Sequence, residues 1–172
     1  MKMLATLITA IVFAASLVTA QGPDKKTWDE VATKAAKFLK SSQDANGGWS
    51  TDKSPGITGV ALTGLLKSGM ATAKDPVAEK ALKYIEGLVN REHKHIAGKD
   101  AKPQLQNYVT SINVMALMAA NQADKYQGII GDAVKFLKKL QWDEEEGKDP
   151  SNDFYGGAGY DSKSRPDLSN TQ

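Results

Sequence analysis

One pattern occurs twice in this chain of 172 residues, and it constrains the fold more than any other feature of the sequence. In each copy an aromatic residue and a leucine end an amphipathic segment, a glutamine follows four residues after the leucine, and a glycine-rich turn ends on an aromatic residue. Two copies predict a protein built from repeated units, each of which buries its apolar face against its neighbours. The first copy consists of Phe38, Leu39, Gln43, Gly47, Gly48 and Trp49, and the second of Phe136, Leu137, Gln141, Gly157, Gly159 and Tyr160.

Helical periodicity covers much of the chain in segments separated by turn residues. The capping-box pattern Thr-Trp-Asp-Glu at residues 27–30 predicts the start of the first helix. Ser54-Pro55 and Asp75-Pro76 predict the starts of the second and third helices, and Gly69 predicts the end of the second. No segment shows the two-residue period of a strand. Further helices are expected over residues 107–121 and 127–140, and residues 166–172 resemble the opening of a sixth.

The expected helices alternate in character. The first, third and fifth have one apolar face, whereas the second and fourth are apolar almost all round. A helix with a polar face lies on the surface and one without it is buried, so the sequence predicts alternating outer and inner helices. Their anchors recur at spacings of 46 (84 minus 38), 52 (136 minus 84) and 55 (116 minus 61), which predict a solenoid or a closed ring of hairpins. These anchors are Phe38, Tyr84 and Phe136 in the outer helices, and Ala61-Leu62 and Ala116-Leu117 in the inner ones.

The N-terminus has the features of a targeting segment. A short basic stretch precedes an apolar run over residues 4–18, and Val18-Thr19-Ala20 has the small residues of a cleavage site. The run is shorter than the ~20 apolar residues of a membrane span. The sequence therefore predicts a signal peptide at residues 1–20 and export to the periplasm or the medium, with an uncleaved anchor as the alternative. Residues 21–172 then form a single domain.

Composition excludes several classes of function. The chain has no Cys, so neither a disulfide framework nor a thiolate zinc site can form. Its net charge of +2 is near neutral and its lysines are scattered along the helices, which is unlike the concentrated basic stripe of a nucleic-acid-binding protein. We therefore expect no nucleic-acid partner, no cofactor and no metal.

The motif that runs from Phe38 to Trp49 resembles the QW motif of the squalene and oxidosqualene cyclase repeat family. The second copy fits with a longer insertion and with Tyr160 in place of Trp. The middle repeat keeps only the helical part of the motif at Tyr84, since Val89 stands where the glutamine belongs. The resemblance covers about residues 28–172 and implies an α/α toroid of outer and inner helices around a central cavity, as in the prenyltransferase β subunits. About half a ring is expected here, which suggests a C-terminally truncated fragment.

The resemblance also implies that the motif residues are structural. A glutamine at a helix end can satisfy the unpaired backbone groups of neighbouring helix termini. A glycine pair permits a left-handed turn, and a buried Trp needs a partner for its indole N–H. We therefore interpret Gln43 and Trp49 as residues that fasten the hairpin.

The sequence contains none of the catalytic patterns of the similar enzymes. The Asp-x-Asp-Asp acid cluster of the cyclases and the Asp-Asp-x-x-Asp diphosphate site are absent, and Asp143 to Glu146 read as a solvated charge run. The leading interpretation is an exported toroid that binds a small molecule or a protein in its cavity. The alternative is a terpene cyclase or prenyltransferase-like enzyme, an isomerase or transferase, whose acid site lies in a missing C-terminal half. A purely structural scaffold is the third.

The candidate binding residues lie where the last inner helix is expected to begin. Tyr160, Asp161, Asp167 and Asn170 would face the cavity there, and Asp167 is the one candidate for an acid. The alternative is that Asp167 caps the helix. His93 and His95 form the only histidine pair, with no third metal ligand identifiable in the sequence.

Overall fold

The computed structural model describes residues 22, 24–100, 105–120, 122–161 and 163–171, and it confirms an all-α fold. Within these residues there is no strand, and one isolated bridge joins Gln141 to Ala158. The predicted signal peptide, residues 1–20, lies outside the described residues. The helices are α1 (Lys25–Ser41), α2 (Gly56–Lys67), α3 (Pro76–Gly87), α4 (Gln106–Ala119), α5 (Ala123–Lys138) and α6 (Leu168–Thr171), with a 3-10 turn η1 (Glu144–Glu146).

The first helix begins earlier than its sequence pattern predicts. Asp24 is the N-cap, and its carboxylate accepts a hydrogen bond from the Thr27 N–H at 2.9 Å. The predicted capping box at residues 27–30 is therefore wrong, because Asp24 already accepts from the Thr27 N–H that the Glu30 side chain was expected to bind. The second helix begins and ends near the predicted residues. The Ser54 hydroxyl accepts from the Gly56 N–H at 3.2 Å, and Gly69 follows the helix with a φ of +72°.

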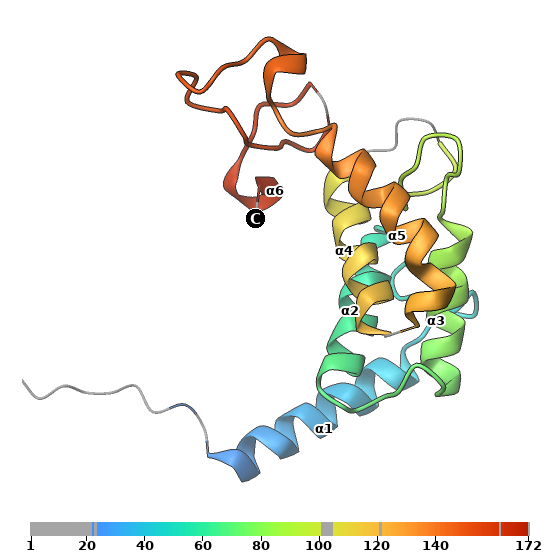
Figure 1. Cartoon of the computed structure of the whole chain (residues 1–172). Coiled ribbons are helices and arrows are strands. Elements are labelled where there is room, and N and C mark those ends of the chain that lie inside the picture. Colours follow the sequence, from blue (N-terminus) through green and yellow to red (C-terminus); the bar gives the residue numbers. More distant parts are fainter. Residues whose placement is uncertain (1–21, 23, 101–104, 121, 162, 172) are drawn as a thin grey trace, which may run out of the picture.

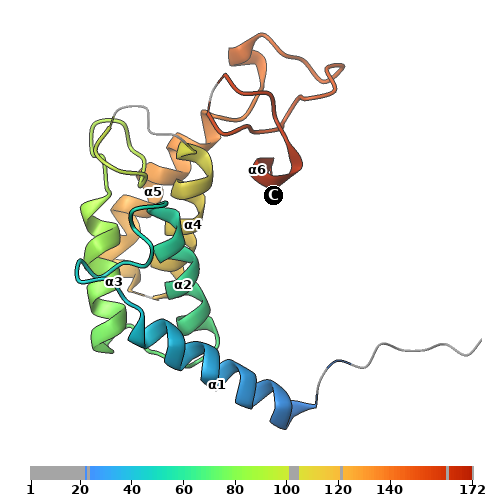
Figure 2. The same cartoon turned by 180° about the vertical axis from the view of Figure 1, so that it is seen from behind.

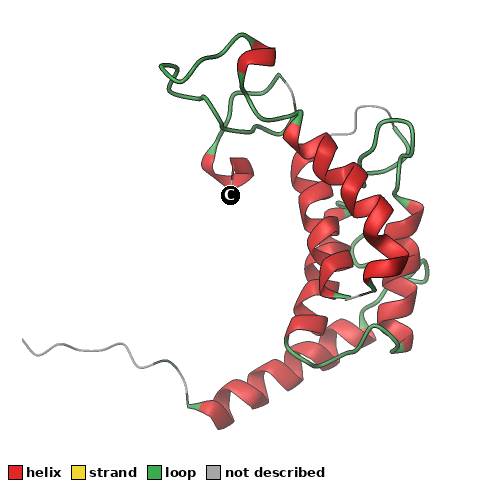
Figure 3. Ribbon diagram, in the orientation of Figure 1, coloured by secondary structure: helices red, strands yellow, loops and turns green. Residues whose placement is uncertain are grey.

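The helices are arranged as a crescent (Figure 1). α2 and α4 lie side by side along its inner side and α3 and α5 along its outer side, an arrangement that is the same when seen from behind (Figure 2). α1 projects from one end, and the loop-rich segment after α5 extends from the other (Figure 3). The predicted alternation of inner and outer helices thus corresponds to the two layers for α2 to α5. The first helix, predicted to be an outer helix, instead projects beyond the layers (Figure 1), and its predicted anchor Phe38 is exposed.

The core lies between the two layers and depends on a close approach of the inner helices. A Cβ atom added to Gly59 of α2 would lie 2.6 Å from the Asn113 Oδ1 and 2.7 Å from the Ile112 Cγ2 of α4. Only glycine permits this distance, so Gly59 sets how closely the inner layer packs. The largest apolar side chains buried in the core are Leu62, Leu65, Ile85, Ile96, Leu117 and Tyr126.

The first hairpin, α1 and α2, is closed by two hydrogen bonds of its loop. The Asp44 N–H donates to the Gly48 carbonyl at 2.8 Å, and the Trp49 N–H donates to the Thr58 hydroxyl oxygen at 3.1 Å. Gly47, which precedes Gly48, has a φ of +92°. Thr58 lies in α2 and is fully buried, so its hydroxyl attaches the loop to the inner helix.

The middle hairpin, α3 and α4, repeats this arrangement with different residues. The Asn90 N–H donates to the His95 carbonyl at 2.9 Å, and the Ile96 N–H donates to the hydroxyl of Thr110, a buried residue of α4, at 3.2 Å. Lys94 has the positive φ, +67°, that glycine has in the first loop. The loop geometry is therefore the same, although a lysine stands where the first loop has a glycine.

The third hairpin, α5 and α6, repeats it again. The Trp142 N–H donates to the Gly157 carbonyl at 2.7 Å, and the Ala158 N–H donates to the Thr171 hydroxyl at 3.1 Å. Gly156 has a φ of +77°. The three hairpins are thus structural repeats defined by an inner-helix threonine.

This repeat corrects two alignments made from the sequence. Ala158, and not Tyr160, occupies the position of Trp49, because the preceding positive-φ residue is Gly156. The inner helices align at Thr58 and Thr110, a spacing of 52 (110 minus 58) rather than the 55 of the Ala-Leu pairs. The alignment of the repeats is therefore set by hydrogen-bond geometry, which cannot be recognised from sequence similarity.

The two hydrogen bonds that recur in every loop form a common hydrogen-bond frame. The side chains of the motif add further hydrogen bonds to it. The Gln43 Nε2 donates to the Gly47 carbonyl and to the Val77 carbonyl of α3, both at 2.8 Å, so it links two consecutive outer helices. The Trp49 Nε1 donates to the Leu39 carbonyl at 2.8 Å, and the ring is only 3% exposed. The Gln141 Nε2 donates to the Gly156 carbonyl at 2.6 Å, which matches the first bond of Gln43.

Candidate functional site

The inner side of the crescent exposes apolar side chains in one stripe along each inner helix. In α2 the stripe contains Ile57 and Val60, and Val60 is 54% exposed. In α4 it contains Tyr108, Met115 and Met118, and Met118 is 63% exposed. Within each helix these residues are three, seven or ten positions apart, so they share one face. We call this set the inner apolar stripe.

The stripe corrects the prediction that the inner helices are buried on every side. Their other faces do pack, since Thr58 and Leu62 of α2 and Asn113 and Leu117 of α4 are fully buried or nearly so. Side chains of α3 and α5 cover those faces from the outer layer. Nothing in the described residues covers the inner stripe, although its residues are as apolar as the core.

The composition of the stripe decides what it can bind. It carries no charge, and its polar groups are limited to the Tyr108 hydroxyl and neighbouring backbone. An exposed cluster of large apolar side chains in a soluble protein is characteristic of a ligand or protein contact. Methionines add flexibility, which suits irregular apolar ligands. The stripe is therefore the strongest candidate for a functional site on this chain.

Asp167 and Asn170, predicted to face a cavity, bind each other at the start of α6. The Asp167 carboxylate accepts hydrogen bonds from the Asn170 N–H at 3.0 Å, from its Nδ2 at 2.8 Å and from the Ser169 hydroxyl at 2.6 Å. The hydrogen bonds from Ser169 and Asn170 hold the pKa of Asp167 below its usual value. A carboxyl group that ionises this readily is a poor proton donor at neutral pH, and its contacts are those of a helix cap.

Asp161 and Tyr160 lie in the turn before α6. The Asp161 carboxylate accepts from the Ser164 N–H at 2.6 Å, and this bond is the main cause of its lowered pKa. The Tyr160 carbonyl accepts from the Asn107 N–H at 3.2 Å, and the neighbouring Gly159 carbonyl accepts from the Asn107 Nδ2 at 2.8 Å. The buried Asn107 thus ties this turn to the first turn of α4.

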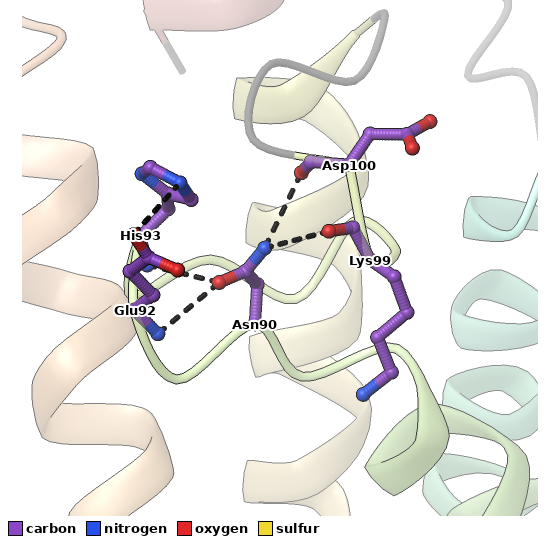
Figure 4. Close-up of polar contacts among 5 residues, drawn as sticks. All are labelled: Asn90, Glu92, His93, Lys99 and Asp100. Carbon is purple, nitrogen blue, oxygen red and sulfur yellow. Dashed lines mark hydrogen bonds and ion pairs between the residues drawn. The ribbon is translucent and has the colours of Figure 1, made fainter.

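The loop of the middle hairpin is organised by Asn90, whose contacts are shown in Figure 4. Its Oδ1 accepts from the backbone N–H groups of Glu92 and His93 at 3.1 and 2.9 Å, and its Nδ2 donates to the Lys99 carbonyl at 2.9 Å. Asn90 follows Val89, the residue in the glutamine position. A buried amide one residue later therefore organises this loop, but its bonds stay within the loop, whereas Gln43 also bonds to the next outer helix.

A polar cleft of about 360 Å³ separates this loop from α5. Lys94 spans it with an ion pair to Asp132 at 2.9 Å, and the buried His95 contacts the Phe136 ring edge-on at 5.3 Å between centroids. The His93 ring stacks on His95 at 6.3 Å. Among the residues that the structure describes, no three side chains of the metal-binding types are grouped to hold an ion.

The residues thus define a class of protein, a helical-hairpin repeat protein with an exposed apolar inner surface. Comparison with known proteins adds no closer identity: no family model matches the chain, and no curated protein or solved structure matches it significantly. Within the described residues, no helix has both the length and the apolar character needed to cross a bilayer.

Helical periodicity missed the inner apolar stripe and the repeated threonine, although the resemblance to a toroid implied that the inner helices line a cavity. An apolar surface that binds a ligand and an apolar surface in a core have the same composition, so Met115 and Met118 were expected to be buried. The threonines left a usable signal, because Thr58 and Thr110 both lie near the starts of the two inner helices.

Proposed function

We propose that this chain is an exported repeat protein of the squalene cyclase and prenyltransferase type, whose half ring of an α/α toroid binds an apolar ligand on its inner surface. The observation that carries the proposal is the inner apolar stripe, which includes Val60 and Met118. Burying one such side chain contributes about 1.5–3 kcal/mol, so a ligand that covers the stripe gains affinity from several residues.

Two further observations support the family and the fold. The Phe38 to Trp49 motif matches the QW pattern, and its Gln43 joins consecutive outer helices, which is the role that a ring of hairpins requires. The three loops share the same pair of hydrogen bonds, so the chain is built from repeats of one kind.

The lowered pKa values of two acidic residues favour a binding function over catalysis. Asp161 and Asp167 are the carboxylates at the predicted cavity entrance, and both accept hydrogen bonds that lower their pKa. A general acid needs the opposite, a carboxyl kept protonated near neutral pH. An apolar surface without such an acid can hold a ligand but has no evident means of transforming it.

The proposal is tested by binding of the fluorescent apolar probe 1-anilinonaphthalene-8-sulfonate, displaced by farnesol. Val60→Glu and Met118→Glu place a charge in the stripe, and each is expected to weaken binding by about tenfold or more. Val134→Glu is the matched control, because Val134 is an exposed valine of α5 in the outer layer. Thermal unfolding of each variant shows that the fold is kept. Equal binding by all three variants and the wild type would overturn the proposal.

Export is tested separately. Secretion in a bacterial host, followed by N-terminal sequencing of the product, is expected to give a chain that begins at Gln21. A product that keeps Met1 and stays with the cells would contradict the predicted signal peptide.

A further inference from the structure

The two ends of the crescent carry opposite charge. α1 has five lysines against Asp29 and Glu30, a net charge of +3. The segment of residues 141–171 has eight acidic residues against Lys148, Lys163 and Arg165, a net charge of −5. The whole chain is near neutral at +2, so this separation is a property of the ends and not of the composition.

The basic end also has an apolar face without a partner. Trp28, Val31 and Phe38 of α1 are exposed, Phe38 by 68%, and with Ala35 they follow spacings of three, four and three residues. They form one stripe along the helix. Ala36 is the only buried residue of α1, so most side chains of this helix are exposed.

The acidic end exposes apolar side chains as well. Tyr155, Tyr160 and Leu168 are all exposed, Leu168 by 85%. Glu145 and Asp153 lie in the same segment with exposed side chains. Each end therefore combines large apolar groups with one sign of charge, and the two signs are complementary.

We propose that two copies of this chain associate reciprocally, with α1 of each copy docked on the acidic segment of residues 141–171 of the other. Both ends lie at the opening of the crescent (Figures 1 and 2), so two crescents that face each other bring the ends together in pairs. A twofold axis makes the two contacts identical, as in most homodimers. Apolar contact supplies the affinity, and charge sets which end meets which. The inference does not depend on the ligand proposed above, although such a dimer would enclose the inner apolar stripe.

The test is a charge exchange followed by sedimentation equilibrium of the full chain. The wild type is expected to sediment with twice the mass of the 18.5 kDa chain. Lys26→Glu with Lys37→Glu makes α1 acidic, and Glu145→Lys with Asp153→Lys reduces the negative charge of the other end. These four residues are exposed and have no ion pair in the structure. Each double variant alone is expected to dimerise at least about tenfold more weakly than the wild type. In the first, an α1 of charge −1 meets a segment of charge −5, and in the second, an α1 of charge +3 meets a segment of only −1.

Mixing the two double variants restores one of the two contacts, because the unaltered α1 of one copy, with a charge of +3, meets the unaltered segment of the other, with a charge of −5. At the second contact the altered α1 and the altered segment each carry only −1. The mixture is therefore expected to dimerise more strongly than either double variant alone and more weakly than the wild type. The control Lys67→Glu with Lys83→Glu, on exposed residues of α2 and α3, is expected to leave dimerisation unchanged. A wild type that is monomeric at every concentration, or a mixture no better than either variant, would overturn the inference. Probe binding by the monomeric variants is measured in parallel, so failure of the dimer and failure of the apolar site give different results.

Discussion

The loops of the first and middle hairpins form the same hydrogen-bond frame from different residues. The first places Gly47 at the position with positive φ, whereas the middle places Lys94 there. A lysine in this left-handed region costs roughly 1–2 kcal/mol relative to glycine. The comparison shows that the frame, an amide donating to an inner-helix threonine, is the constant part of the repeat, and that the residues around it are free to differ.

The two loops also differ in what secures them. The first is fastened by neutral groups, the Gln43 amide and the Trp49 indole, which bond to backbone carbonyls. The middle loop relies on the Asn90 amide and on the ion pair between Lys94 and Asp132. The first loop is tightly packed against α3, while the middle one borders a polar cleft. The first loop is thus held by close packing and neutral hydrogen bonds, whereas the stability of the middle loop depends more on an ion pair.

The largest expected effect is that of Gly47→Ala. The added Cβ would lie 2.5 Å from the Lys80 carbonyl oxygen of α3, and φ is +92°. Clash and backbone strain together are expected to lower the free energy of unfolding by more than about 2 kcal/mol. Urea denaturation measures it. Gly64→Ala is the control, because a Cβ there meets nothing within 4 Å. A loss below 0.5 kcal/mol, taken as roughly the noise of surface substitutions, would show that the first loop is not rigid.

The second effect compares the two glutamines. Gln43→Ala removes two hydrogen bonds, one of which joins consecutive outer helices, and is expected to cost about 1–3 kcal/mol. Gln141→Ala removes one bond from an exposed side chain and is expected to cost less than about 1 kcal/mol. Equal losses by chemical denaturation would mean that the bond to the Val77 carbonyl does not stabilise the packing of neighbouring hairpins.

The third substitution is expected to stabilise the protein rather than destabilise it. Lys94→Gly relieves the left-handed strain and removes only a surface ion pair, so it is expected to stabilise the protein by up to about 1 kcal/mol. Asp132→Asn removes the same ion pair without relieving strain and serves as the control. If Lys94→Gly destabilised the protein more than Asp132→Asn, the lysine backbone would not be strained and the comparison of the loops would lose its basis.

The smallest effect is a dependence on pH. Glu86 of α3 is affected by burial, which raises its pKa, but hydrogen bonds from Lys125 and Tyr126 outweigh burial, so its pKa lies below the usual 4.5. A carboxyl whose pKa is lowered by folding stabilises the protein above its unfolded pKa and loses this contribution as the pH falls through the folded pKa. The advantage of the wild type over Glu86→Gln is therefore expected to be constant above about pH 5 and to shrink below about pH 4.5. Thermal unfolding of both proteins between pH 7 and 3 measures it, and an advantage that grew in acid would contradict the assignment.

Much of the fold could be predicted, because its main signals are local. Helical periodicity and the Ser54 and Gly69 boundary signals identified the helices, and the Gln43 to Trp49 pattern identified the hairpin. The third repeat was misaligned because an aromatic residue, Tyr160, resembled Trp49, while the conformation of Gly156 decides the register. Exposure of the inner stripe could not be predicted, since it depends on whether another element covers Met115 and Met118, and their sequence is the same in either case.

Each loop is held by a threonine of its own inner helix, and amide hydrogen exchange tests this role of the threonines most directly. Thr58→Val is expected to speed exchange of the Trp49 amide and leave the Ile96 amide unchanged, whereas Thr110→Val does the reverse. Rates at both amides that stay at the wild-type values in both variants, or that rise together in each, would contradict the account of separate, repeated frames.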